Sequence, residues 1–257
     1  MFVTTAGRTD QIMIEKANEI AQQLQIEYVH RRKRSIPTLQ QLRSDSCIVV
    51  GKERLELYPL GFNEPFFFHP NSAMFRIKRL QAGEHDPFIE ATNLSLGKEF
   101  LDCTLGLASD SIVASFVIGS RGTVVGVEGN EYLSYLVKVG LKQWDSGISA
   151  MNEAMNRIQV EHGNSLNMLK TMKDNSFDCV YFDPMFEENI VESDGIKGLT
   201  NLALYEEITE EYINEALRVA RERIVLKDHF RSNRFEKFSF KVLKRKTAKF
   251  HFGILKK

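Results

Sequence analysis

The chain has 257 residues, of which 43% are apolar and 26% charged, a composition that excludes disordered and collagen-like chains. Its 34 basic and 34 acidic side chains cancel, so net charge neither favours nor excludes a nucleic-acid partner. No apolar run reaches the roughly 18 residues that a membrane span needs, and the first residues lack a secretory signal pattern, so we expect a cytoplasmic protein.

The first 70 residues predict a small α/β domain. Residues 2–5 have the pattern of a short strand, and Asp10 is placed to cap a helix whose apolar residues follow at helical spacing. Three further strands are expected, and the last two are joined by a turn: 26–29, 46–50 and 55–58. Several turn formers lie in residues 60–86, so we place a domain junction there and assign 71–257 to a second domain.

Strands and helices alternate regularly from residue 98 onward, which is typical of a doubly wound parallel sheet. Residues 238–243 and 250–255 lie too close together for a crossover helix, so they predict an antiparallel hairpin. The expected fold is therefore an α/β, Rossmann-like sheet with a C-terminal antiparallel hairpin. The predicted strands are 98–103, 123–128, 158–162, 177–183 and 224–227, and the predicted helices are 109–118, 131–141, 148–155, 165–172 and 205–220.

Charged side chains are segregated along the chain although they cancel overall. Residues 183–215 are strongly acidic, whereas 30–34, 76–79 and the segment from 221 onward are basic. Most charge runs are solvated surface, but basic clusters also bind phosphate groups. The residues that we select as candidates for RNA phosphates are Arg76, Lys78, Arg79, Lys227, Lys244, Arg245 and Lys246.

The cysteines do not form a metal-binding pattern. Cys47, Cys103 and Cys179 are far apart, and each lies in or beside an apolar run. We therefore expect buried thiols and no metal.

The first strand of the second domain leads through a turn of small residues into a helix. Asp102 ends this strand, Gly106 lies in the turn, and Ser109 and Asp110 begin the helix. Small residues let a ligand approach the backbone, and the start of a helix offers unpaired N–H groups. A dinucleotide fingerprint has three glycines, so this turn alone does not define the ligand.

Polar residues follow the next two strands at what should be the same edge of the sheet. Glu128 and Gly129 come about twenty residues after the turn, where a carboxylate can accept both hydroxyls of a ribose, unless Glu128 is a surface acid. Asn164 and Ser165 follow the third strand, where they could bind an adenine, unless Asn164 simply caps the next helix.

The fourth strand ends in Asp183-Pro184-Met185-Phe186. An aspartate at the carboxyl end of a strand, followed by a proline and then an aromatic residue, resembles the acid/amide-Pro-x-aromatic motif of amino-group methyltransferases. An exocyclic base amine shares its lone pair with the ring, so methyl transfer to it requires hydrogen-bond acceptors that hold the amine. Asp183 and the Pro184 carbonyl are candidates for these acceptors, and Phe186 could stack on the base. An Asp-Pro turn followed by a core phenylalanine is the structural alternative.

Together these segments resemble the class I S-adenosylmethionine-dependent methyltransferases. More narrowly, the chain is similar to the J-type methyltransferases of small-subunit ribosomal RNA, a family that shares the Asp-Pro-Met-Phe sequence; Ala108 replaces a glycine of that family. The resemblance implies methyl transfer to guanine N2, with small-subunit ribosomal RNA as partner and Asp183, Pro184 and Phe186 at the reacting amine. It implies cofactor contacts at Asp102, Gly106, Ser109, Asp110, Glu128, Gly129, Asn164, Ser165 and Asp183.

Three other functions remain open from the residues alone. The same cofactor could serve a protein or small-molecule acceptor, which the acidic segment after Phe186 supports. The loop and Glu128 would also suit a nicotinamide-dependent dehydrogenase, although the predicted hairpin and the Asp183 motif speak against it. A noncatalytic RNA-binding relic of the fold is the last alternative.

Overall fold

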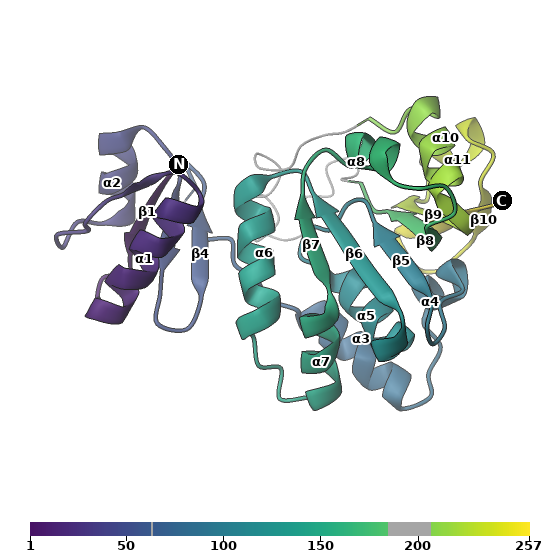
Figure 1. Ribbon diagram of the computed structural model, residues 1–257, viewed down its shortest axis with the longest axis horizontal. Coiled ribbons are helices and arrows are strands. Elements are labelled where there is room, and N and C mark those ends of the chain that lie inside the picture. Colours follow the sequence, from purple (N-terminus) through teal and green to yellow (C-terminus); the bar gives the residue numbers. More distant parts are fainter. Residues whose placement is uncertain (63, 185–206) are drawn as a thin grey trace. The chain divides into compact units, whose positions relative to one another are not determined.

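The computed structural model describes residues 1–62, 64–184 and 207–257 (Figure 1). These residues form two compact units, the first ending at His69 and the second beginning at Pro70. None of the helices among the described residues combines the length and the apolar character needed to cross a membrane.

The first unit is a four-stranded sheet in the order β2-β1-β3-β4, with β1, β2 and β3 parallel and β4 antiparallel to β3. Its helix α2 was not predicted, because only eight residues form it. Ser35 caps α2 by accepting a hydrogen bond from the Thr38 N–H at 3.2 Å. The elements are β1 (Phe2–Thr5), α1 (Gln11–Gln23), β2 (Glu27–Tyr28), α2 (Ile36–Arg43), β3 (Cys47–Val50) and β4 (Leu55–Tyr58).

The second unit contains a seven-stranded sheet in the order β10-β11-β9-β8-β5-β6-β7. Strands β9 to β7 in this order are parallel, and β11 and β10 add an antiparallel hairpin at one edge. The predicted fold class is therefore confirmed. The strands are β5 (Glu99–Asp102), β6 (Thr123–Glu128), β7 (Gln159–His162), β8 (Phe177–Phe182), β9 (Ala220–His229), β10 (Lys241–Leu243) and β11 (Phe250–Lys256).

Helices cover both faces of this sheet (Figure 1). On one face α5 contacts α3 and α7, and on the other α10 contacts α8. Successive side chains of β8 point to opposite faces of the sheet, so this strand contributes to the hydrophobic packing on both. Tyr181 packs on Phe88 on one face, and Phe182 packs on Tyr212 on the other. The helices are α3 (Asn71–Gln81), α4 (Pro87–Thr92), α5 (Ser109–Ile118), η1 (Gly119–Arg121), α6 (Glu131–Gln143), α7 (Ser149–Arg157), α8 (Ser165–Thr171), α10 (Glu210–Val219) and α11 (Arg234–Lys237).

Two helices lie at and just beyond residues 60–86, the stretch in which we placed the domain junction and predicted no helix. Helix α3 buries Ala73 and Ile77 at i, i+4 spacing, a stripe too narrow to stand out among its charged neighbours. Helix α4 begins at Pro87, and the Asp86 carboxylate caps it by accepting from the Phe88 N–H at 2.9 Å.

The order of the strands places a switch point between β5 and β8. The chain builds β5, β6 and β7 toward one edge and then returns to add β8 and β9 on the other side of β5. The connections that follow β5 and β8 run in opposite directions from this point, so the loops after these two strands diverge. Ligands of such sheets bind at the carboxyl ends of the strands at this point.

Candidate functional site

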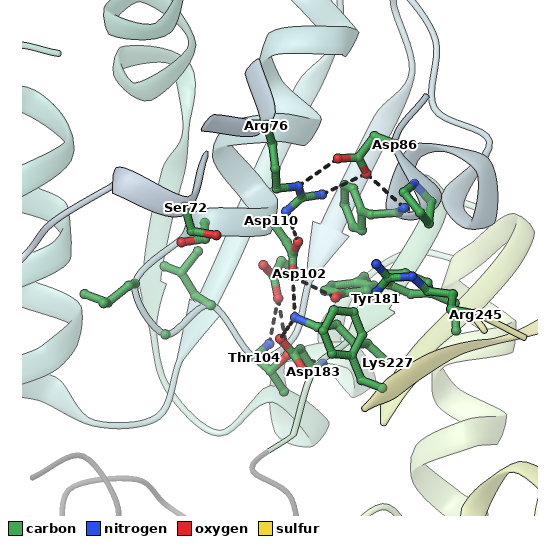
Figure 2. A pocket seen from close by; sticks show the side chains of 18 of the residues that line it. Ser72, Arg76, Asp86, Asp102, Thr104, Asp110, Tyr181, Asp183, Lys227 and Arg245 are labelled. Carbon is green, nitrogen blue, oxygen red and sulfur yellow. Dashed lines mark hydrogen bonds and ion pairs between the residues drawn. The ribbon is translucent and has the colours of Figure 1, made fainter. Parts of the chain in front are cut away.

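A cavity of about 460 Å³ lies at the switch point (Figure 2). The loop after β5, the end of β8 and the end of β9 form its inner wall, and α3, the start of α4 and the C-terminal hairpin contribute the rest. Its polar lining residues are Ser72, Arg76, Arg79, Asp86, Asp102, Thr104, Ser109, Asp110, Tyr181, Asp183, Lys227 and Arg245.

Asp102 fixes the loop that leads from β5 into α5. Its side chain is buried and accepts hydrogen bonds from the Thr104 N–H at 3.0 Å and from the Ser111 hydroxyl at 2.7 Å. Burial raises the pKa of Asp102 to about 7, because few dipoles replace the lost water. Asp102 therefore fixes the conformation of the loop by hydrogen bonds to Thr104 and to α5.

The loop itself has an unusual backbone. Gly106 has a φ of +49°, and Ala108, which replaces the glycine of the J-type family, has a φ of +61°. A residue with a Cβ is disfavoured in this left-handed region, so the surrounding packing must hold Ala108 there. Gly126 of β6 allows this packing, since a Cβ at that position would lie 2.3 Å from the Leu105 side chain.

Glu128 ties the loop to the neighbouring strand. Its carboxylate accepts hydrogen bonds from the Gly106 N–H at 3.1 Å and from the Asn130 N–H at 2.9 Å, at the carboxyl end of β6. Glu128 is buried, so the alternative that it is only a surface acid is wrong. Gly129 follows Glu128 directly in the chain.

Asn164 and Ser165 lie at the same sheet edge, after β7. The Asn164 side chain accepts from the Asn167 N–H at 2.9 Å, so it does cap α8, and Ser165 forms a hydrogen bond with the Tyr212 hydroxyl. Neither residue lines the 460 Å³ cavity, and neither do Glu128 and Gly129. The predicted cofactor residues thus divide into a cavity group and a group at the ends of β6 and β7.

Asp110, in the first turn of α5, is the centre of a buried ionic network (Figure 2). It accepts hydrogen bonds from Arg76 Nη1 at 2.5 Å, from the Tyr181 hydroxyl at 2.8 Å and from Lys227 Nζ at 3.1 Å. Arg76 also forms a two-pronged contact with Asp86, at 2.8 and 3.0 Å. The network joins α3, α4, α5, β8 and β9 in one cluster.

Asp183 follows β8 and joins this network from the opposite side. Its backbone N–H donates to the Thr104 hydroxyl at 2.6 Å, and Lys227 Nζ donates to its carboxylate at 2.5 Å. Its side chain keeps 27% of its exposure, so one side of the carboxylate is open to the cavity. Pro184 follows it, whereas Phe186 lies outside the described residues.

The two acids of this network have opposite pKa shifts. Burial raises the pKa of Asp183, and although Lys227 lowers it, the charge of Asp110 adds to the rise, to about 6. Burial alone would also raise the pKa of Asp110, but Lys227 and Arg76 hold it well below its usual value. Asp183 is thus the group of this pair that titrates nearer to neutral pH.

The network carries a net negative charge when its members are ionised. Asp86, Asp110 and Asp183 contribute three negative charges against two positive charges from Arg76 and Lys227. The cavity lining as a whole adds Asp102, Arg79 and Arg245, so this excess is local to the network, where it favours a cationic group over an anionic one. Among the described residues, no group of three or more His, Cys, Asp or Glu side chains is arranged to hold a metal ion.

The predicted phosphate-binding cations are not equivalent in the structure. Arg76 and Lys227, which we selected as candidates for RNA phosphates, are each paired with two carboxylates inside the site. Arg79 and Arg245 line the cavity, and the Arg245 guanidinium lies 4.5 Å from the centre of the Phe250 ring. The residues that are exposed but do not line the cavity are Lys78, Lys244 and Lys246.

Helix periodicity explains this division for the cations of α3. Ser72, Arg76 and Arg79 share one face of α3, at i, i+4 and i+7, whereas Lys78 points to another. A cluster that is continuous in sequence is therefore split between the cavity and the outer surface.

Several site residues had no clear signal in the sequence. Thr104 and Tyr181 looked like ordinary loop and strand residues, and their partners Asp183 and Asp110 lie 79 and 71 positions away in the chain. Asp86 could have been found, since an Asp-Pro pair before an apolar run is a helix-start signal. Phe250 was predicted only as part of a strand.

Comparisons with known proteins agree with this geometry. A family model described as "Putative SAM-dependent methyltransferase" matches residues 16–252. The protein YpiP of Bacillus subtilis, described as uncharacterized, is 48% identical over 254 residues, covering 99% of this chain and 98% of YpiP.

A second relative has a named substrate. The ribosomal RNA small subunit methyltransferase J of Francisella tularensis subsp. novicida is 39% identical over 87 residues, so the match spans about a third, 34%, of each chain. Among solved structures, a SAM-dependent methyltransferase from Neisseria gonorrhoeae superposes with a TM-score of 0.65 at 15% identity, over 100% of this chain and 96% of that one, which shows a shared fold.

Proposed function

Because this chain belongs to a family of SAM-dependent methyltransferases, with S-adenosylmethionine as the cofactor, we propose that it methylates the exocyclic amine of a nucleic-acid base, guanine N2 of small-subunit ribosomal RNA. The observation that carries this proposal is the position of Asp183. Its carboxylate faces the same cavity as the loop after β5 and is held by Lys227, while its backbone N–H donates to the Thr104 hydroxyl. The named activity of the Francisella relative supports the choice of RNA.

The donors and acceptors around the cavity fit the cofactor. S-adenosylmethionine supplies a methyl group on a positively charged sulfur atom, and the excess negative charge of the network suits that cation. We propose that Gly106 and the start of α5 contact its amino-acid part, that Glu128 and Gly129 hold the ribose, and that Asn164 and Ser165 lie at the adenine.

Asp183 would then act on the acceptor rather than on the methyl group. Its carboxylate and the Pro184 carbonyl accept the two N–H groups of the base amine and aim the nitrogen at the methyl carbon. As the new C–N bond forms and the C–S bond breaks, the nitrogen becomes positively charged and loses a proton, which Asp183 can accept. Lys227 keeps the carboxylate in place by its contact at 2.5 Å.

The cofactor assignment predicts an effect of Glu128. We expect Glu128→Ala to weaken S-adenosylmethionine binding by about 1–3 kcal/mol, because the ribose would lose a charged acceptor. Isothermal calorimetry with S-adenosylmethionine and S-adenosylhomocysteine measures this. Glu131→Ala is the matched control, since Glu131 is exposed in the first turn of α6. Equal affinities for the parent and Glu128→Ala would remove Glu128 from the cofactor site.

The raised pKa of Asp183 predicts a pH-dependent rate. Its protonated, neutral form accumulates as the pH falls through about 6, and that form no longer presents a free carboxylate to the amine. We therefore expect kcat, measured between pH 5 and 8 with cofactor and RNA saturating, to fall about tenfold per pH unit below 6. Asp102 titrates near 7, so Asp183→Asn serves as the control. If the residual kcat of Asp183→Asn falls below pH 6 in the same way as that of the parent, the titrating group is not Asp183.

The proposed guanine acceptor has a direct test. Nucleosides from small-subunit ribosomal RNA of cells with and without the gene are compared by mass spectrometry. We expect one N2-methylguanosine to be lost and to return when the purified protein acts on that RNA. An unchanged nucleoside profile would leave the cofactor assignment standing and contradict the RNA acceptor.

The remaining alternatives have less support. The argument for a protein or small-molecule acceptor was the acidic segment after Phe186. The part of that segment up to residue 206 lies outside the described residues. A nicotinamide-dependent dehydrogenase is contradicted by the family match over residues 16–252. We propose that Arg79 and Arg245, which line the cavity, and the exposed Lys78, Lys244 and Lys246 contact RNA phosphates.

A further inference from the structure

The unit of residues 1–69 carries exposed cations at one edge of its sheet. Since β1, β2 and β3 are parallel, the loops that follow them share the carboxyl edge. Hydrogen bonds hold these loop starts together: Ala6 N–H donates to the Val50 carbonyl at 2.9 Å and Val29 N–H to the Val3 carbonyl at 2.7 Å. Of the six exposed cations of these loops, Arg54 pairs with Glu56 at 2.7 Å, and we use the name basic edge for the other five, Arg8, Arg32, Lys33, Arg34 and Lys52.

The charges at the two edges of this sheet are treated differently. At the amino edge the N-terminal amine pairs with Asp45, and Arg43 pairs with Glu27 at 2.7 Å. No member of the basic edge forms an ion pair with any residue in the part of the chain that the structure describes. The same three loops contain only two acids, of which Asp10 is engaged as the cap of α1. The basic edge is thus a local concentration of positive charge without ion-pair partners, on a unit whose remaining side chains include eight acidic and four basic ones.

The longest of these loops is held in one conformation. Arg31 donates from Nη1 to the Thr5 carbonyl at 3.1 Å and from Nε to the Arg34 carbonyl at 2.9 Å. Between these anchors Arg32 and Lys33 have φ values of +43° and +61°, a conformation that residues with a Cβ adopt at a cost. Arg31 therefore fixes the backbone of this loop, so that the loop needs no further ordering when its neighbouring cations bind a ligand.

We propose that the basic edge is a docking surface for the phosphate backbone of the RNA substrate. This inference rests on the proposed function, because it takes RNA to be the molecule that is methylated. Adjacent strands lie about 4.8 Å apart, so the three loops spread their cations over about 10 Å before side-chain reach is added. That spread fits successive phosphates of one polyanionic chain better than a single small anion.

An anionic membrane would also attract these cations, but stable membrane binding needs exposed apolar side chains as well. Ile12, 74% exposed near the start of α1, is the large apolar side chain exposed beside these loops. Stable binding to a bilayer needs more buried apolar area than one such side chain supplies. The basic edge contributes affinity without reading sequence, and it leaves the chemistry at Asp183 unchanged.

The test compares two pairs of substitutions of equal charge. Arg32→Gln with Arg34→Gln removes two cations of the basic edge and leaves Arg31 and the backbone contacts in place. Lys16→Gln with Arg43→Gln removes two cations elsewhere in the same unit. Binding of the full-length protein to small-subunit ribosomal RNA from cells lacking the gene is measured by filter binding at several salt concentrations, and binding to phosphatidylglycerol vesicles is measured in parallel.

We expect the basic-edge variant to bind the RNA roughly tenfold more weakly near physiological salt, with a salt dependence shallower by about 1.5–2 logarithmic units per tenfold change in salt. The control variant should bind like the parent, and S-adenosylmethionine affinity should be the same for all three. With RNA saturating, kcat should be unchanged while the KM for RNA rises in the basic-edge variant only.

Three results would overturn the inference: RNA binding that is the same in parent and basic-edge variant, an equal loss in the control variant, or binding to the vesicles that exceeds binding to RNA. Failure of the proposed function is a separate result. It would be seen as absence of guanine methylation by the parent protein, and the binding comparison would still decide whether the basic edge recognises RNA.

Discussion

Asp183→Ala is expected to abolish methyl transfer to guanine, with a loss of roughly 10²–10³-fold or more in kcat. The substitution removes an acceptor that the amine needs most in the transition state, when positive charge develops on its nitrogen. Asp183→Asn should keep part of the activity, because its side-chain carbonyl still accepts one hydrogen bond. The measurement is single-turnover methylation of ribosomal RNA with cofactor saturating.

Two controls separate chemistry from binding and folding in that experiment. Cofactor affinity is measured for each variant by calorimetry, because Asp183 lies in the cavity beside the loop after β5. Asp178→Ala is the matched variant, since Asp178 is the second residue of the same strand, pairs with Lys98 and Arg221, and does not line the cavity. Parent-like turnover by Asp183→Ala would show that Asp183-Pro184 is only a turn.

The second large effect is expected from Lys227→Met, in the stability of the fold. Lys227 is the shared partner of Asp110 and Asp183, with side chains that are 17%, 10% and 27% exposed. Removing it leaves two carboxylates close together without the cation between them, which should lower the free energy of unfolding by about 2–4 kcal/mol, at the lower end of the range for buried pairs because some solvent reaches the site. Urea denaturation at pH 7.5 measures this.

The direction of the pH effect follows from the same contacts. Lys227 lowers the pKa of Asp183, so its loss should raise that pKa further above about 6. Carboxylates with raised pKa values bind protons more readily when folded, so the stability deficit of Lys227→Met should shrink as the pH falls. Combining it with Asp183→Asn should recover part of the stability at pH 7.5 by removing one of the two opposed charges.

Lys244→Met provides the control for that series, because Lys244 is exposed and belongs to no ion pair among the described residues. It should unfold like the parent. A Lys227→Met protein with parent stability would mean that water or a rearranged Arg76 compensates the carboxylates, and Lys227 would then have no role in holding Asp183.

Local sequence patterns predicted most of the regular structure of the second unit. Helix 109–118 and strand 123–128 have the predicted bounds, and the antiparallel hairpin followed from the short separation of its strands. Helix α3 was missed because only Ala73 and Ile77 face the core, so hydrophobic periodicity was too weak to show above the charged residues.

The sequence by itself determined the fold class and the polar residues at the carboxyl ends of β5, β6, β7 and β8, because those properties depend on periodicity and on where strands end. Only the tertiary structure decided how the charged side chains are used. Arg76 and Lys227 are 151 residues apart, yet both pair with Asp110, and a long-range ionic contact leaves no local pattern in sequence. The same reason applies to Arg31, whose contact with Thr5 across 26 positions turns a basic run into a fixed loop.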